Sequence, residues 1–313
     1  MATGKQYYGG FFWVALVSFT VPFFVGWKAF QNIQPTQKPT PQVDASGVDH
    51  AVWDYLLKTY VSNGLVDYEG MKKDYLFKEY LREIGSCKPD QLATSEEKLA
   101  LHCNAYNALV INGVISHKIY DSVNSFQIDG TGFFDLKEHI FAGQTVSLND
   151  VEHKMVRPVF REPRIHVALV CAARSCPAIR PEAYVGSRVL EQLEDQSRLF
   201  ANNRKYVDYD QSKNVLKLNP ILKWYGQDWD ERFPAGGKLE WLFGLIDTDI
   251  KNNEKLLNAQ MNLRQKIQDA SDKKIEVIYL KYDWTVNSLA EPGKGPTKSK
   301  STAKSGSGGG PDE

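Results

Sequence analysis

Apolar residues recur at helical spacing near the start of the folded part of the chain. In "DHAVWDYLLKTYVSNG", Val52, Leu56 and Tyr60 are four residues apart, which places them on one face of a helix. Gly64 is typical of the residue that follows a helix C-terminus. We therefore expect the first helix to end at Gly64.

Two more helix starts are indicated by capping patterns. Thr94 with Glu97 three residues later forms a capping box, and Ser147 with Asp150 has the same spacing. The first of these starts is followed by a stripe of apolar residues, Leu99, Cys103, Tyr106 and Val110. That spacing predicts a long helix with a buried face, whereas Pro158 disturbs the second helix soon after it begins.

Runs of β-branched residues predict a few strands. "IHVALVC" (165–171) is too short and too β-branched for a helix, so it predicts an internal strand. "KYVDYD" and "NVLKLN", joined by "QSK", predict a hairpin, and "KIEVIYLKYDW" predicts a last strand. The remaining helical patterns cover about 181–203, 238–246 and 254–270. Helices dominate and strands do not alternate regularly with them, which predicts an α+β fold, a mostly helical single domain with a small sheet.

The N-terminal region predicts a transmembrane helix before this domain. Residues 11–27, "FFWVALVSFTVPFFVGW", carry no charge and have aromatic residues at both ends. "VGWKAFQ" lacks a small-x-small cleavage pattern, which favours an uncleaved signal anchor over a signal peptide. We therefore expect a single-pass membrane protein, attached to the membrane through this helix, with its globular domain on the extracytoplasmic side.

Composition divides the chain into five segments. Residues 1–10 form a short tail, 11–27 the anchor, and 28–46 a linker rich in Pro, Gln and Thr. The globular domain is expected over 47–290. Residues 291–313 contain no aromatic or branched aliphatic residue, so a disordered tail is expected there.

Charge and histidine content limit the function classes. The 38 basic and 38 acidic residues balance, and the central region has no long basic run, which argues against a nucleic-acid partner. A protein or peptide partner stays open. The six histidines lie between His50 and His166, and the four cysteines are too few for a disulfide scaffold of this length. We expect neither a cofactor nor a metal.

Two asparagines interrupt the apolar pattern of the capped helix. Asn104 and Asn107 lie three residues apart, next to the apolar stripe. Asparagine is a poor helix former, so both need a reason. Either their amides hydrogen-bond nearby backbone, which is the usual role of buried amides, or they bind a substrate or orient another side chain.

A histidine and two cysteines lie in "RIHVALVCAARSCPAI". On a strand, His166 and Cys171 point to opposite faces, so they are not a natural pair. Cys176 follows a short link, "AARS", and a turn there could bring its sulfur back to His166. Three uses compete: Cys176 as a nucleophile with His166 or Arg174 nearby, a Cys171–Cys176 disulfide or redox pair, and a metal site without an evident fourth ligand.

Further polar residues follow in two aromatic segments. In "YDWTVN", Asp283 either caps a turn or orients His166 as the third member of a triad, and Asn287 either accepts backbone donors or lines a site. In "NPILKWYGQDW", Asp228 is either a turn residue or part of a pocket wall. Spacing does not decide between these interpretations.

The motifs together resemble a known family. "GLVDYEG", "NAYNAL", "SLNDVEH", "RIHVALVCAARSCPAI", "NPILKWYGQDW" and "YLKYDWTVN" are similar, in this order, to the uncharacterised-domain family numbered 547, a domain of unknown function, over about 52–287. The family pattern matches at Asn104, Tyr106, Asn107, His166, Cys171, Cys176, Pro177, Asp283, Trp284 and Asn287. The resemblance implies one pocket between the asparagine-bearing helix, the His/Cys segment and the terminal Asp-bearing strand.

The leading hypothesis is a thiol-dependent hydrolase or acyl transferase. Cys176 would be the nucleophile, His166 its base, and Asp283 or Asn107 the group that orients the histidine. Substrate-binding residues are predicted at Asn104, Tyr106, Arg174 and Asn287, with Asn104 as a candidate oxyanion donor. The alternatives are a non-catalytic binding or assembly module with a Cys171–Cys176 disulfide, and a thiol redox protein, so the sequence leaves open whether the domain is an enzyme.

Overall fold

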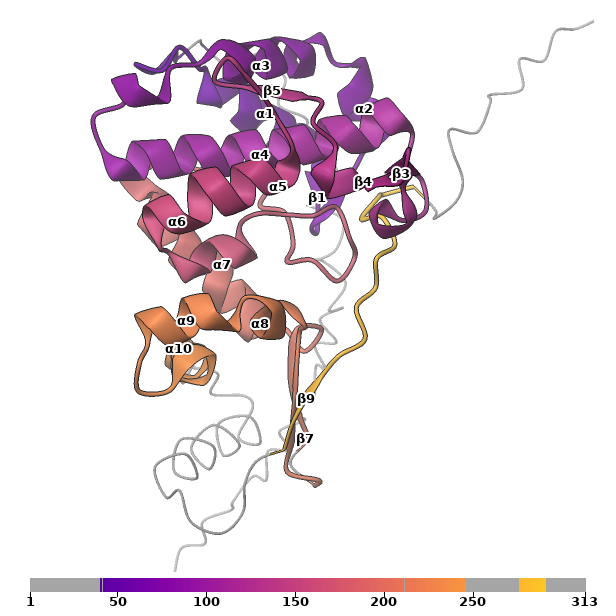
Figure 1. Cartoon of the computed structure of the whole chain (residues 1–313), viewed down its shortest axis with the longest axis vertical. Helices are drawn as coiled ribbons and strands as arrows, with labels where there is room; N and C mark the ends of the chain where they lie inside the picture. Colours follow the sequence, from indigo (N-terminus) through magenta and orange to yellow (C-terminus); the bar gives the residue numbers. More distant parts are fainter. Residues whose placement is uncertain (1–39, 41, 211, 246–275, 291–313) are drawn as a thin grey trace, which may run out of the picture. The chain divides into compact units, whose positions relative to one another are not determined.

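The structure is a computed structural model that describes residues 40, 42–210, 212–245 and 276–290. Figure 1 traces these residues from indigo at the N-terminal end to yellow at the C-terminal end. They all fall within one unit, Gln37–Glu313. The predicted short tail, the anchor, most of the linker, the helix expected over 254–270 and the C-terminal tail lie outside the described residues.

The predicted fold class needs a correction at its N-terminal element. Across the ranges that the structure describes, no helix is long and apolar enough to cross a membrane. The segment predicted as an anchor, residues 11–27, lies outside those ranges. Helices and a small sheet are both present in the described residues, so the structure supports the α+β fold and not the preceding membrane helix.

Three helices open the described domain, and each begins at an aspartate. They are α1 (His50–Tyr60), α2 (Tyr68–Lys73) and α3 (Tyr75–Ser86). The carboxylates of Asp49, Asp67 and Asp74 each accept a backbone N–H from the first turn, which satisfies a donor that the helix leaves free. The first helix is shorter than predicted, because Gly64 lies in the turn of a hairpin between β1 (Val61–Ser62) and β2 (Leu65–Val66).

The long helix α4 (Ser95–His117) lies at the centre of the packing. Its predicted capping box is confirmed, with Thr94 and Glu97 bonding each other's backbone N–H groups. Every residue from 103 to 111 is buried, so several faces of the helix are covered. The helix packs against α2, α3, the short 3-10 helix η1 (Pro89–Gln91) and later elements. A helix covered in this way must place its asparagines inside the core.

Small hairpins and a π-helical segment follow α4. The hairpins pair β3 (Gln127–Ile128) with β4 (Thr131–Gly132), and β5 (His139–Phe141) with β6 (Gln144–Val146). The 3-10 turns η2 (Val123–Ser125) and η3 (Phe133–Asp135) lie beside them. The second capping box, Ser147 with Asp150, is confirmed and begins α5 (Leu148–Asp150), which continues as the π-helical η4 (Val151–Val156) and α6 (Arg157–Phe160).

The strand predicted over 165–171 is wrong. Residues Pro163–Val167 form the 3-10 helix η5, and an irregular buried loop follows. The run is apolar because it is buried, but its backbone polar groups pair with the side chain of Asn107, with the Ile165 carbonyl and with the Cys176 sulfur, and not with a neighbouring strand. Because the segment is not a strand, strand alternation does not separate the side chains of His166 and Cys171.

Among the described residues, the C-terminal part contains a three-stranded sheet and four helices. The predicted hairpin is confirmed, with β7 (Val207–Asp210) antiparallel to β8 (Val215–Leu218). The last strand is shorter than predicted and forms β9 (Glu276–Tyr279), parallel to β8. The helices are α7 (Val189–Ala201), preceded by η6 (Gly186–Arg188), and α8 (Ile221–Trp224), α9 (Gly226–Arg232) and α10 (Gly237–Leu245).

Two apolar clusters meet at the loop after η5. One cluster gathers α1 to α4 and the elements up to the start of α7, and it includes Ile165 and Ala168. The other gathers the end of α7, β8 and α8 to α10, and it includes Val167. Tyr282 packs against both clusters. The segment that carries His166 and both cysteines thus lies between two cores.

Candidate functional site

A tight loop brings the two site cysteines together. Ala172 has a left-handed backbone with φ of 60°, and the N–H of Cys176 bonds the carbonyl of Ala173 at 3.0 Å. The loop closes so that the backbone N–H of Cys171 donates to Sγ of Cys176 at 3.0 Å. The two cysteines therefore form a local pair, as the alternative of a disulfide or redox pair requires, although all four cysteines are free thiols in this structure.

The two sulfurs have opposite protonation chemistry. A hydrogen bond from the Cys176 thiol is the largest effect on the pKa of Cys171, and it lowers this pKa. Burial opposes it, and the Tyr282 hydroxyl lowers the pKa further. The Tyr282 oxygen lies 3.3 Å from the Cys171 sulfur, and the N–H of Ala173 also lowers this pKa. Burial, and then the neighbouring Cys171, raise the pKa of Cys176 well above its usual value. Cys171 is partly exposed and Cys176 is buried, so Cys171 is the candidate nucleophile of this pair.

His166 belongs to a network of carboxylates and an arginine. Its Nε2 lies 2.7 Å from Oδ2 of Asp228, and its Nδ1 lies 3.8 Å from Oε1 of Glu152. Arg157 binds Asp228 through two hydrogen bonds, of 2.9 Å from Nε and 2.8 Å from Nη2. Burial alone would raise the pKa of Asp228, but the bonds from His166 and Arg157 outweigh it and lower this pKa well below its usual range.

Burial keeps the His166 imidazole neutral. Burial lowers its pKa, and the opposing effects of Asp228 and Glu152 do not restore it. A neutral imidazole that faces the ionised Asp228 at 2.7 Å donates from Nε2. The other nitrogen, Nδ1, is then an acceptor on the side of Glu152.

Tyr225 connects this network to the thiol. Its ring stacks on His166 with centroids 3.9 Å apart and planes 14° apart, and the Arg157 guanidinium lies 5.0 Å above the ring centroid. Burial, then the charge of Glu152 and a hydrogen bond to it, and then Cys171, raise the pKa of the Tyr225 hydroxyl. Tyr106 also bonds Glu152, at 3.1 Å, and its pKa is raised by burial, Glu152 and Cys171. The two phenols therefore stay protonated beside Glu152.

The structure does not bring together the predicted triad. In the part of the chain that it describes, neither nitrogen of His166 makes a hydrogen bond with a sulfur. The exposed Asp283 accepts the backbone N–H of Thr285 at 3.0 Å, which is the turn interaction weighed for it, and it does not contact His166. Asp228 takes the place expected for Asp283 beside the histidine.

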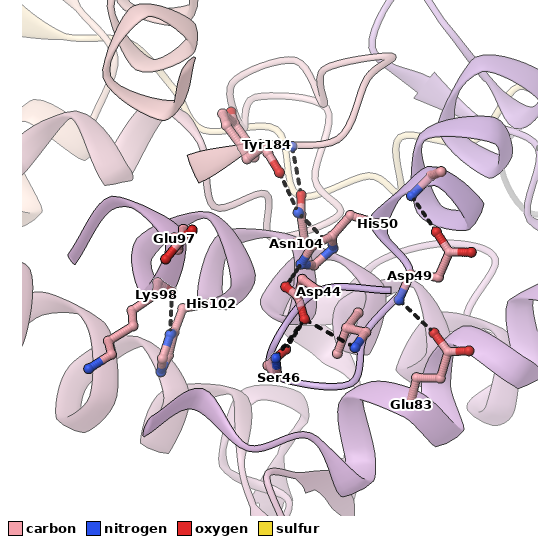
Figure 2. Close-up of polar contacts among 12 residues, drawn as sticks. Asp44, Ser46, Asp49, His50, Glu83, Glu97, Lys98, His102, Asn104 and Tyr184 are labelled. Atoms are coloured by element: carbon pink, nitrogen blue, oxygen red, sulfur yellow. Dashed lines mark hydrogen bonds and ion pairs between the residues drawn. The ribbon is translucent and has the colours of Figure 1, made fainter. Parts of the chain in front are cut away.

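The predicted asparagines bond the protein's own backbone. Figure 2 shows Asn104 between Tyr184 and His50: its amide accepts the Tyr184 N–H at 2.9 Å, donates to the Tyr184 carbonyl at 2.8 Å and lies 3.2 Å from Nδ1 of His50. Asn107 donates to the Ala168 carbonyl at 3.0 Å and accepts the Val170 N–H at 2.9 Å. These contacts favour the structural interpretation of both residues.

Asn287 and Arg174 lie on the terminal side of the site. Asn287 accepts the Tyr68 hydroxyl at 2.5 Å and donates to the Gly64 carbonyl at 3.4 Å. Arg174 has a buried Nε without a hydrogen-bond partner in the described structure. Hydrogen bonding to Thr285 is the main cause that lowers the pKa of Asp283, and the charge of Arg174 lowers it further. Arg174 is thus the predicted binding residue that has donor capacity left.

Tyr282, which lies beside the thiol, belongs to a group of three aromatic side chains. Tyr282, which contacts the Cys171 sulfur, has its ring centroid 4.6 Å from Trp284 and 4.9 Å from Trp224. Trp224 and Trp284 stack with planes 19° apart, and Trp224 is 49% exposed. A separate hollow of about 900 Å³ is lined by residues of 177–182, α7 and Tyr206, and its lining includes neither sulfur. The aromatic group, with the half-exposed Trp224, thus adjoins the Tyr282 side chain that contacts Cys171.

Sequence reasoning missed several members of this site. Glu152 lies within the motif "SLNDVEH" and Tyr225 within "NPILKWYGQDW", but no spacing rule joins either residue to His166. Asp228 was predicted as a turn residue or part of a pocket wall, and its bond to His166, 62 residues away, was not predicted. The sequence predicted a role for Asp283, whereas its neighbour Tyr282 is the residue that contacts the Cys171 sulfur. In the described ranges, no group of three or more His, Cys, Asp or Glu side chains could hold a metal ion.

Comparison with known proteins gives a family without an assigned activity. Residues 89–201 match the family model described as "Protein of unknown function, DUF547", which confirms the resemblance predicted from the motifs over part of the range expected for it. The matched range includes Glu152, His166 and both cysteines, whereas Asp228 and Tyr282 lie beyond it. No curated protein and no solved structure matches the chain.

Proposed function

We propose that this domain is a thiol-dependent hydrolase or acyl transferase with Cys171 as its nucleophile. The observation that carries the proposal is a partly exposed sulfur, 3.3 Å from the Tyr282 hydroxyl, whose surroundings lower its pKa. Burial raises the pKa of Cys87 to about 11 and that of Cys103 to about 12, so those thiols stay protonated. Cys176 supports the Cys171 thiolate instead of attacking the substrate itself.

The reaction follows from a thiolate that is present before substrate binds. The Cys171 sulfur attacks a carbonyl carbon, a tetrahedral intermediate forms, and the bond to the leaving group breaks to give an acyl thioester. Water or another nucleophile then attacks this carbonyl, the C–S bond breaks, and the thiolate is regenerated. Because no base has to deprotonate the nucleophile, His166 need not contact the sulfur.

Proton transfer is assigned to the phenols around Glu152. The Tyr225 hydroxyl, which is held protonated by burial and by Glu152, donates its proton to the leaving group and becomes a phenolate. Glu152 later accepts a proton from the attacking water and passes it to this phenolate through their hydrogen bond, which restores both groups. His166 is a positioning residue in this scheme, because it stacks on Tyr225 at 3.9 Å and is fixed by Asp228. Arg157 fixes Asp228 in turn.

The aromatic group supplies a wall for the acyl part of the substrate. Trp224 is half exposed and stacks on Trp284. It also contacts the ring of Tyr282, which lies beside the thiol. Flat apolar surface of this kind gains free energy when another apolar group covers it. Arg174, with its unpartnered Nε, is the candidate donor for a polar group of the same substrate.

Acetylation with p-nitrophenyl acetate tests the proposal. We expect a burst of p-nitrophenolate and one acetyl group on the peptide that contains Cys171, and Cys171→Ala should remove both. Cys103→Ala is the matched control, because Cys103 is buried, protonated and distant in sequence, and the burst should persist. An acetyl group on Cys176, or labelling of all cysteines only after unfolding, would contradict the assignment.

A further inference from the structure

We propose that Cys171 and Cys176 are also an oxidation site, at which a peroxide oxidises Cys171 and Cys176 then closes a reversible disulfide that blocks the nucleophile. This inference rests on the proposed function only through the thiolate assigned to Cys171. It does not require that the domain transfers acyl groups.

The loop geometry already holds the second sulfur in place. Cys176 Sγ accepts the backbone N–H of Cys171 at 3.0 Å, and the left-handed Ala172 keeps the loop closed. The carbonyl of Ala172 accepts the Asn287 N–H at 2.9 Å, and the N–H of Arg174 bonds the Thr285 carbonyl at 2.7 Å. The loop is thus fixed from outside, with the Cys176 sulfur held against the backbone of Cys171.

The chemistry balances with a hydroperoxide as the oxidant. The Cys171 thiolate attacks one peroxide oxygen, the O–O bond breaks, and the sulfur is oxidised to a sulfenic acid while the peroxide is reduced to water or an alcohol. The Cys176 sulfur then attacks the Cys171 sulfur, an S–S bond forms, and the S–O bond breaks. The hydroxide that leaves takes up the proton lost by Cys176, so water is released.

The first oxidation prepares Cys176 for its own step. After burial, the Cys171 thiolate is what raises the pKa of Cys176, both through its hydrogen bond and through its charge. A sulfenic acid is neutral, so this part of the shift disappears when Cys171 is oxidised. The N–H of Cys171, 3.0 Å from the Cys176 sulfur, remains as a donor that stabilises the new thiolate. The Tyr282 hydroxyl, 3.3 Å from the Cys171 sulfur, can donate to the leaving hydroxide.

The other two cysteines provide internal controls. Cys87 and Cys103 are buried, and burial raises the pKa of each. Because the thiolate is the form that reacts with peroxide, both should stay reduced while Cys171 reacts. Selective oxidation of one pair among four thiols is therefore expected in the folded protein.

Peptide mapping after peroxide treatment tests the site in the full chain. The folded, reduced protein is treated with one equivalent of hydrogen peroxide, its remaining thiols are blocked, and it is digested with trypsin. Cleavage after Arg174 separates the two cysteines, so "IHVALVCAAR" and "SCPAIRPEAYVGSR" stay joined only through a disulfide. We expect this joined peptide, and its loss on reduction. In Cys176→Ser we expect the sulfenic acid to persist at Cys171 and to be trapped by dimedone.

The outcomes separate this inference from the proposed function. A joined peptide without acetylation of Cys171 would support the oxidation site and contradict the acyl transferase. Acetylation without a joined peptide would do the reverse. Equal oxidation of Cys87 and Cys103, or dimedone labelling of Cys176→Ser no greater than that of Cys171→Ser, would overturn the oxidation site. A slower oxidation of Tyr282→Phe would support it, because the lost hydroxyl leaves less thiolate.

Discussion

At the level of single residues, hydrogen bonds to sulfur distinguish Cys171 from Cys176. Donors from the Cys176 thiol, Tyr282 and the Ala173 N–H lower the pKa of Cys171. Cys176 also receives donors, from the Cys171 N–H and Tyr282, but burial and the neighbouring Cys171 outweigh them and raise its pKa. A hydrogen bond to an ionised group is about twice as strong as one between neutral groups. Of the two nearby sulfurs, Cys171 is therefore the one that loses its proton more easily.

His166 gives a prediction about the pH dependence of stability. Burial lowers its pKa in the folded protein below the usual 6.5, although Asp228 and Glu152 oppose this. The unfolded chain therefore binds a proton that the folded one does not, so the stabilisation is present above pH 6.5 and is lost as the pH falls towards the folded pKa. We expect His166→Gln to flatten the pH dependence of the free energy of unfolding between pH 7.5 and 5.5 by up to about 1.4 kcal/mol per pH unit. Urea titrations at several pH values measure it, and equal slopes for both proteins would contradict it.

At the level of elements, local signals predicted what local contacts determine. Both capping boxes and the hairpin of β7 with β8 lie where the sequence placed them, because each is completed by residues a few positions apart. The prediction of a strand over 165–171 was wrong because an apolar, buried segment need not form a strand. Its backbone is satisfied by the Asn107 amide, 61 and 63 residues away in sequence, and no periodicity reports such a bond.

The site was predictable only in part for the same reason. His166 and the cysteines stood out as polar residues in an apolar run, whereas Asp228 stood out only as one acid among aromatics. What joins His166 to Asp228 is the packing of α9 against η5, which depends on contacts between distant segments. The partners of a buried side chain thus needed the structure.

Two similar turns give a matched prediction about the contact between the first hairpin and the site loop. Asn63-Gly64 and Asp129-Gly130 both have positive φ at each position. A Cβ on Gly64 would lie 2.6 Å from the Cβ of Ala178, whereas none of the atoms around Gly130 comes within 4 Å of such a Cβ. Gly130→Ala should cost about 1–2 kcal/mol for the left-handed backbone. Gly64→Ala should cost a further ~1–3 kcal/mol for overpacking.

Urea denaturation of the two variants measures this difference. The alkylation rate of Cys171 should fall in Gly64→Ala alone, because Ala178 follows Cys176 and Pro177 in the site loop. Equal losses of stability in the two variants would show that the hairpin does not press on that loop.

At the level of the whole molecule, the last described segment joins the early helices to the site. The Leu289 N–H bonds the carbonyl of Val66, while Val286 pairs with Ala173. Tyr282 packs against both apolar clusters. A short C-terminal segment therefore links β2, the cysteine loop and the two cores, although the family match ends well before it.

Truncation tests whether this segment holds the site. A chain that ends after Leu280 loses the Tyr282 hydroxyl at Cys171 and the backbone bonds of Asp283, Thr285 and Asn287 to the loop. At about 1 kcal/mol for each hydrogen bond, it should lose several kcal/mol of stability. Its Cys171 should react with iodoacetamide more slowly than in the full chain, because the pKa rises when the Tyr282 donor is lost. A chain that ends after Ala290 keeps all of these bonds and is the control, and thermal melts with alkylation rates measure both. If the shorter chain does not fold, Tyr282→Phe in the full chain isolates the thiol effect, and an unchanged alkylation rate there would show that the C-terminal segment does not activate Cys171.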